Sequence, residues 1–278
     1  MKKLTLLLDG TRSSEALLDC ARDSFGNEEA TLVGVIPQTA APIDILTAIT
    51  QISECKEGGK YSWYETLKRI YRHSSANDTA FVERFVEKCQ QLNLRTRVLY
   101  HDDVESRNLL RETQFSDLLV LSASQFVPDS RLTAPPRQQL QLLRGAGCPI
   151  LIVPAKYERI ENYLLVYEGT ASCMRTIRQF SALLTDAARK CKILLAVVGD
   201  KSRQHAEEVR LLQEFADSHF PKFSILPLLD NAEEEILYNA REEDGVLLVC
   251  GSETHTLASL LIHNSKLRRF EFPVFVGR

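Results

Sequence analysis

The sequence lacks any paired arrangement of cysteines. Disulfide-stapled domains and structural zinc sites both depend on ordered cysteine spacings, and this chain has no Cys-x-x-Cys motif. Its cysteines are odd in number and scattered, which excludes both classes. The four that adjoin apolar residues are expected to be buried thiols. The seven cysteines are Cys20, Cys55, Cys89, Cys148, Cys173, Cys191 and Cys250, and the four are Cys20, Cys148, Cys191 and Cys250.

The chain also lacks a long apolar run and an excess of basic residues. No run approaches the about 20 residues of a membrane helix, and Asp9 interrupts the N-terminal apolar stretch, which is too short for a signal peptide. Lys and Arg number 34 against 37 Asp and Glu, a net charge of −3, and no dense basic block occurs. We therefore expect a soluble, cytoplasmic protein that binds neither membranes nor nucleic acids.

What the chain does contain is an internal repeat. Residues 4–18 (LTLLLDGTRSSEALL) resemble 162–176 (NYLLVYEGTASCMRT), because each has an apolar run, an acid, Gly-Thr and a helical stretch. SDLLVLSASQ (116–125) resembles DGVLLVCGSE (244–253), and CPILIVPAK (148–156) resembles FPVFVGR (272–278). The three landmarks occur in the same order. The repeat predicts two homologous domains, 1–156 and 157–278, each large enough, with 44% apolar residues overall, to bury a core.

Within each copy, apolar strands alternate with amphipathic helices. Strands with few charges are typical of a parallel sheet that helices cover on both faces, and the alternation forces right-handed crossovers. The fold class predicted is α/β, with two tandem, doubly wound, open parallel five-stranded sheets of Rossmann-like type. Strands are expected at 3–9, 30–36, 95–100, 118–122, 150–154, 163–167, 192–198, 223–229, 246–250 and 273–277. Helices are expected at 13–25, 62–92, 104–114, 135–145, 170–189, 203–219, 232–242 and 256–268, with Asn231 as an N-cap.

The first copy is longer than the second, mainly because of an insertion at about 37–60. This segment begins with two prolines, carries the apolar residues Ile43, Leu46 and Ile49, and ends in Gly-Gly. We interpret it as a surface excursion that packs on its own domain. The alternative is a flap over a ligand or over the partner domain.

Ligands of open parallel sheets bind beyond the carboxyl ends of the strands, where the winding reverses. In the first copy these ends carry Asp9-Gly10-Thr11 and Ser122, and in the second they carry Glu168-Gly169-Thr170 and Gly251 to Thr254. A small residue there lets a phosphate approach the backbone, and a helix N-terminus supplies N–H donors. A strand-end carboxylate can accept from ribose hydroxyls or help to hold Mg²⁺ beside a phosphate. The pattern therefore predicts candidate nucleotide sites in both copies.

This pattern resembles the universal stress protein family over nearly the whole chain, as a tandem of two such domains. Nucleotide-binding members carry Gly-x2-Gly-x9-Gly-[Ser/Thr] after the fourth strand. In the second copy Gly251 matches the first glycine and Ser265 keeps the hydroxyl, with Ser252 inside the motif. Thr254 and Asn264 stand where the other two glycines belong. Asn264 is the milder change because Asn tolerates a left-handed backbone.

The first copy departs further from the family pattern. Ser122 replaces the first glycine, and the segment after it has no glycine-hydroxyl ending. This copy keeps the strand-one aspartate of the family as Asp9, followed by Gly10 and Thr11, whereas the second copy has Glu168. Neither copy holds the whole set of site residues. The resemblance therefore implies adenine-nucleotide sites, for ATP or AMP with Mg²⁺ accompanying ATP, that are degenerate or confined to the second copy.

No residue stands out as catalytic, and His101-Asp102-Asp103, which could suggest a metal site, is interpreted as a turn into the next helix. His255 and His263 flank the motif and are read as solvated or capping residues, and Ser265 lacks a His-acid partner at a recognisable spacing. We therefore expect a non-enzymatic stress-response or regulatory protein. The two domains are expected to pair as an internal pseudo-dimer, with a homodimer also open. The alternatives are a slowly hydrolysing ATP-binding member that uses the second copy, and a sensor of a small ligand or a protein partner.

Overall fold

In the part of the chain that the structure describes, ten strands form a single sheet, with helices on both of its faces. The computed structural model describes residues 2–8, 13–25, 30–37, 83–91, 94–101, 107–123, 137–184, 191–199, 203–229, 231–242, 244–254 and 272–278. The strands are β1 (Lys2–Leu7), β2 (Ala30–Pro37), β3 (Arg95–His101), β4 (Leu118–Ser122), β5 (Ile150–Val153), β6 (Asn162–Tyr167), β7 (Lys192–Val198), β8 (Phe223–Leu228), β9 (Val246–Gly251) and β10 (Val274–Gly277). The helices are α1 (Ser13–Phe25), α4 (Arg107–Thr113), α5 (Arg137–Gly145), α6 (Ala171–Leu183), α8 (Arg203–His219) and α9 (Ala232–Glu242), and residues 83–91 are also helical.

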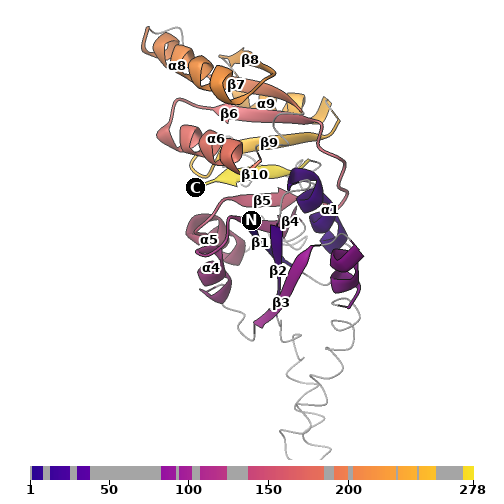
Figure 1. Ribbon diagram of the computed structural model, residues 1–278. Helices are drawn as coiled ribbons and strands as arrows, with labels where there is room; N and C mark the ends of the chain where they lie inside the picture. Colours follow the sequence, from indigo (N-terminus) through magenta and orange to yellow (C-terminus); the bar gives the residue numbers. More distant parts are fainter. Residues whose placement is uncertain are drawn as a thin grey trace, which may run out of the picture.

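The strand order is the same in the two parts of the sheet. The sheet runs β3-β2-β1-β4-β5-β10-β9-β6-β7-β8 (Figure 1), so the first five strands and the last five follow the same order outward from the centre. We refer to β1–β5 with their helices as the first half and to β6–β10 with theirs as the second half. All pairs within a half are parallel. The predicted α/β, doubly wound parallel architecture is confirmed.

The expectation of two separate sheets is wrong, because β5 and β10 join the halves into one sheet. These two strands pair antiparallel, with Ile152 opposite Val274 and Ile150 opposite Val276. Each would otherwise be an unpaired edge with free N–H and C=O groups, and pairing the two edges satisfies both. Because this pairing is antiparallel, the strands of the two halves run in opposite directions within the sheet. The carboxyl-end edge of the second half therefore lies beside the amino-end edge of the first.

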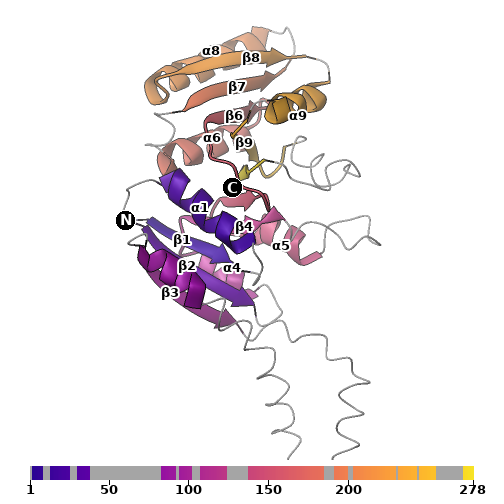
Figure 2. The ribbon, with the colours of Figure 1, turned by 90° about the vertical axis from the view of Figure 1, so that its right-hand side faces the viewer.

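On each face of the sheet, the covering helices come from both halves. One apolar cluster lies under α1, residues 83–91, α6 and α8, and the other lies under α4, α5 and α9. Figure 2 shows α1 and α6 on one side of the sheet and α5 and α9 on the other. Each cluster contains residues of both halves, such as Leu17 with Phe180 in the first and Leu142 with Ile236 in the second. The halves thus share their cores, and the boundary at residue 156 stays a prediction.

The segment between β5 and β6 is fastened at one turn of the second half. Gly245 accepts hydrogen bonds from the backbone N–H groups of Glu161 (2.8 Å) and Asn162 (3.2 Å). Its backbone has φ +64°, and a Cβ at this position would lie 2.3 Å from the carbonyl oxygen of Arg159. Only glycine combines a left-handed backbone with so close an approach. The path from one half to the other therefore depends on this residue.

Most predicted elements appear within one or two residues of their expected bounds. The helix expected at 170–189 ends earlier, at Leu183, with Leu184 as its C-cap. Asn231 does precede α9, but its φ of +53° is left-handed and not the extended backbone of an N-cap. The insertion at 37–60 and the helix expected at 256–268 lie outside the described residues. Within the described part of the chain, no helix has the length and apolar character needed to cross a membrane.

Candidate functional site

The second half has its topological switch point between β6 and β9. These strands are parallel neighbours, with Leu165 opposite Val249, and the chain continues from them in opposite directions across the sheet. Their carboxyl ends lead into Glu168-Gly169-Thr170 and into residues 251–254, here termed the Gly251 turn. This is the position at which open α/β sheets bind ligands. The structure therefore brings Glu168, Gly251, Ser252 and Thr254 to one edge, as the sequence predicts.

The Gly251 turn is closed by its own groups. The backbone N–H of Thr254 donates to the carbonyl oxygen of Gly251 at 3.3 Å, and the Thr254 hydroxyl donates to the same oxygen at 2.8 Å. Thr254 is only 2% exposed, so its side chain points into the protein. A phosphate cradle needs backbone N–H groups that are free to converge on an anion. In this turn the N–H of residue 254 is already engaged.

Helix packing explains why a glycine stands at position 251. A Cβ at Gly251 would lie 3.0 Å from the hydroxyl oxygen of Ser172 and 3.4 Å from the Ser172 carbonyl carbon. Ser172 belongs to the first turn of α6, which packs against the end of β9. The glycine that matches the family motif therefore lets α6 approach the sheet. This role needs no bound phosphate.

The N-terminus of α6 is capped within the protein. The Thr170 hydroxyl accepts a hydrogen bond from the backbone N–H of Cys173 at 3.2 Å and contacts the Cys173 sulfur at 3.1 Å. The backbone N–H of Glu168 donates to the same sulfur at 3.3 Å. The Ser172 hydroxyl is buried and has no hydrogen-bond partner among the described residues. The cap engages the donors of Glu168 and Cys173, which removes them from a prospective anion.

The charges at this edge are mainly negative. Burial raises the pKa of the Cys250 thiol, and the carboxylate of Glu168 adds to the effect. Burial also raises the pKa of Tyr167, with the carboxylate of Glu208 as the second cause. Glu208 projects from α8 to within 3.6 Å of the Cβ position of Gly169. Two carboxylates beside the strand ends repel a bare phosphate, so an anion here would need an accompanying cation.

The remaining predicted site residues are not assembled by the described structure. In the first half, Ser122 ends β4, pairs with Val153 of β5 and is completely buried, and its role as a site residue stays a prediction. The other predicted residues lie outside the described part of the chain: Asp9, Gly10, Thr11, Asn264 and Ser265. In the part that is described, no group of three or more His, Cys, Asp and Glu side chains is placed to hold a metal ion.

The cysteines behave mostly as the sequence predicts. Cys20, Cys148 and Cys250 are buried, whereas Cys191 is only partly buried. Burial raises the pKa of both Cys20 and Cys148 to about 12, so these thiols stay protonated and unreactive near neutral pH. Cys55 lies outside the described residues.

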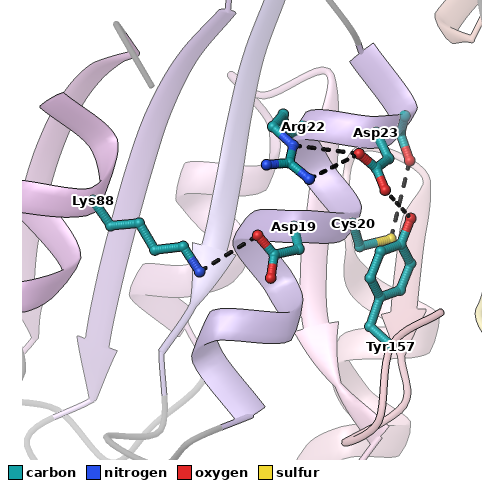
Figure 3. A network of polar contacts seen from close by, with 7 residues as sticks. Asp19, Cys20, Arg22, Asp23, Lys88 and Tyr157 are labelled. Carbon is teal, nitrogen blue, oxygen red and sulfur yellow. Dashed lines mark hydrogen bonds and ion pairs between the residues drawn. The ribbon is translucent and has the colours of Figure 1, made fainter. Parts of the chain in front are cut away.

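A polar network beside Cys20 had no signal in the sequence. The hydroxyl of Tyr157, from the segment between the halves, donates to the Asp23 carboxylate of α1 at 3.2 Å (Figure 3). Arg22 pairs with the same carboxylate at 3.2 Å, and Lys88 pairs with Asp19 at 3.4 Å. Tyr157 is far from Asp23 along the chain, and Lys88 is far from Asp19, so spacing could not reveal these two contacts. The network ties the connecting segment to α1.

Comparisons with known proteins agree with this architecture at the level of fold. No protein-family model matches the sequence, and no curated protein matches it. A universal stress protein from Archaeoglobus fulgidus DSM 4304 is 14% identical, with 99% of this chain and 98% of that chain covered at a TM-score of 0.58. A protein of Pseudomonas aeruginosa UCBPP-PA14 assigned to the same family is also 14% identical, covering 100% and 93% at a TM-score of 0.60.

A third similar structure is a domain of a cotransporter. The cytoplasmic domain of a prokaryotic cation chloride cotransporter is 12% identical, with 99% of this chain and 95% of that chain covered at a TM-score of 0.56. Identities this low establish the fold alone. The chain is thus an α/β protein with a strand-end candidate site. More specifically, it has the universal stress protein fold over its whole length.

Proposed function

We propose that this protein is a non-enzymatic, universal stress protein-like regulatory protein whose adenine-nucleotide site in the second half is degenerate. The observation that carries the proposal is the closed Gly251 turn. Thr254, standing at the second glycine position of the family motif, is buried and directs both its hydroxyl and its backbone N–H to the Gly251 carbonyl. A triphosphate would have to displace these contacts before the turn could donate to it.

The surroundings of the turn support the same conclusion. Glu168 and Glu208 place negative charge near the strand ends, and α6 occupies the space over Gly251. Removing a buried hydrogen bond costs about 1 kcal/mol or more, and repulsion from the carboxylates adds to that cost. Nucleotide binding at this edge is therefore expected to be weak, with a Kd above about 1 mM, which corresponds to about −4 kcal/mol of binding free energy.

The fold by itself does not decide the function. It occurs both in a universal stress protein and in the cytoplasmic domain of a cotransporter, and one fold commonly hosts unrelated functions. The proposal rests on the site, where Thr254 engages the Gly251 carbonyl with both its hydroxyl and its backbone N–H. A turn closed in this way favours a regulatory role over the ATP-binding alternative.

Two measurements test the proposal. Mass spectrometry of the protein purified under native conditions should show no adenine nucleotide carried over. Calorimetric titration with Mg-ATP should show no saturable binding up to about 1 mM. Carried-over ATP or AMP, or a Kd in the micromolar range, would contradict the degenerate site and favour the ATP-binding alternative if the binding is located at the Gly251 turn.

If the titration shows binding, a variant of the Gly251 turn tells whether the nucleotide binds there. Ser252→Trp adds bulk at a half-buried position of the Gly251 turn and leaves the buried Thr254 in place. Binding that the wild type shows and Ser252→Trp loses would place a functional nucleotide site at this turn, against the proposal. Binding that persists in the variant would place the nucleotide elsewhere and leave the turn degenerate, as proposed. Circular dichroism confirms that the variant is folded.

A further inference from the structure

The side chain of Arg278 crosses from the second half to the first. It follows β10, and its guanidinium donates to three backbone carbonyl oxygens at the end of α5: Leu143, Arg144 and Ala146. The bond from Nε to Ala146 measures 3.0 Å. The last carbonyls of a helix lack intrahelical partners and carry partial negative charge. A guanidinium offers several donors in a fixed fork and is suited to satisfy them together.

The backbone that carries Arg278 is held firmly against the candidate site. Gly277 pairs with Gly251 in the sheet, so Arg278 follows at the level of the Gly251 turn. A Cβ at Gly277 would lie 2.6 Å from the Cα of Thr176, which shows how closely α6 packs here. The N–H of Arg278 donates to the Gln179 side chain of α6 at 2.8 Å. The direction of the arginine side chain is therefore set by β9 and α6.

Electrostatics also connects Arg278 to the turn. Burial lowers the pKa of the guanidinium, and the carboxylate of Glu253, inside the Gly251 turn, acts in the opposite direction. The positive charge of Arg278 thus contacts the carbonyl end of α5 and also feels the carboxylate of the turn. A displacement of the turn would change the field and the packing around this arginine.

Helix α5 leads from this contact to the other candidate region. β4 and β5 are parallel neighbours, so the connecting helix runs back from their carboxyl-end edge to their amino-end edge. β4 ends at Ser122, which places the other end of the α5 connection on the first half's strand-end side. α5 has nine residues and spans about 13 Å. One short helix thus follows β4 in the order of elements and ends at the contact with Arg278.

We propose that Arg278 is a latch that couples the Gly251 turn of the second half to helix α5 of the first half, so that loosening the turn loosens the helix. The coupling does not depend on nucleotide binding and therefore goes beyond the proposed function. It gives the protein a route by which an event at one strand-end region changes the local stability of an element next to the other.

Hydrogen exchange of the protein, read by mass spectrometry, tests the latch. Arg278→Ala should raise the exchange rate of peptides covering 137–147 by about tenfold, the size expected when hydrogen bonds from a charged donor are lost. Arg278→Lys should give a smaller rise, because an ammonium cannot reproduce the fork. Arg175→Ala removes an exposed arginine of α6 and should leave these peptides unchanged. Peptides of β7 must stay constant, which excludes global unfolding.

The coupling itself is read from a double-mutant comparison. Thr254→Val keeps the side-chain shape and removes the hydroxyl that closes the turn. It should raise exchange of α5 in the wild type and should add nothing there in the Arg278→Ala background. If Thr254→Val loosens the turn but leaves α5 unchanged, or adds equally in both backgrounds, the latch is refuted. If Arg278→Ala fails to fold, Arg278→Lys takes its place in the comparison.

Discussion

Replacing Gly245 by alanine should destabilise the protein far more than an ordinary glycine substitution. The left-handed backbone (φ +64°) costs an L-residue about 1 to 2 kcal/mol. The new Cβ would lie 2.3 Å from the Arg159 carbonyl oxygen, so the segment between the halves must move away. That movement breaks the hydrogen bonds from Glu161 and Asn162 to Gly245, each worth about 1 kcal/mol. The expected loss is therefore about 3 to 4 kcal/mol.

The assay is urea unfolding monitored by circular dichroism, with Gly169→Ala as the matched control. Gly169 is also left-handed, at φ +71°, but a Cβ there meets only Glu208 at 3.6 Å, which is ordinary contact. It should therefore lose only the backbone component, about 1 to 2 kcal/mol. A total of 3 to 4 kcal/mol is a large share of the about 5 to 15 kcal/mol typical of domains.

The difference between the two variants is the quantity that the structure predicts. If Gly245→Ala is no more destabilising than Gly169→Ala, the close approach of the connecting segment is wrong, and with it the account of how the halves are joined. A change in the slope of the unfolding curve would indicate that the halves unfold separately in the variant. In that case midpoints are compared for each transition.

Three further predictions concern single positions. Gly277→Ala should destabilise by about 2 kcal/mol or more through overpacking, because its Cβ would meet Thr176 backbone at 2.6 Å; thermal melting measures it, and an unchanged Tm would contradict the packing. Thr254→Val should lose about 1 kcal/mol with the hydroxyl bond to Gly251, whereas Thr254→Ser should lose less, by urea unfolding. In the folded protein the pKa of Cys20 is raised from 9.0 to about 12, so between these values only the unfolded state ionises. The free energy of unfolding therefore falls as the pH rises through this window, by up to about 1.4 kcal/mol per pH unit from this group. Cys20→Ala should show a shallower fall between pH 8.5 and 10.5, and equal slopes in the two proteins would refute the assignment.

Much of the fold was readable from the sequence because it depends on local patterns. Short apolar strands such as 118–122 and 246–250 are buried on both faces, so they lack the alternation of a half-exposed strand and are recognised as interior strands of a parallel sheet. Glycine or small residues at their ends mark where the sheet edge lies. Those signals located Glu168 and the Gly251 turn correctly at one edge.

The candidate site was less predictable, because the roles of its residues come from contacts across the chain. Thr254 was identified as a replaced glycine, but only the structure shows that its hydroxyl closes the turn. Gly251 was expected to admit a phosphate, whereas the structure places Ser172 of α6 against it. Ser122 was a candidate ligand contact and is completely buried. Sequence spacing identifies positions at a strand end but not the direction in which each side chain points.

The sequence alone was enough for the α/β class and for the strand ends near which the candidate site is proposed, because hydrophobic periodicity and turn residues act over short stretches of chain. Only the tertiary structure decided that β5 and β10 merge the repeats into one sheet, that Gly245 fastens the connecting segment, and that Arg278 reaches α5. These features join residues more than 80 positions apart, or strands of opposite direction. They form only when helix faces and sheet edges from distant parts of the chain pack together, and no local pattern of residues predicts that packing.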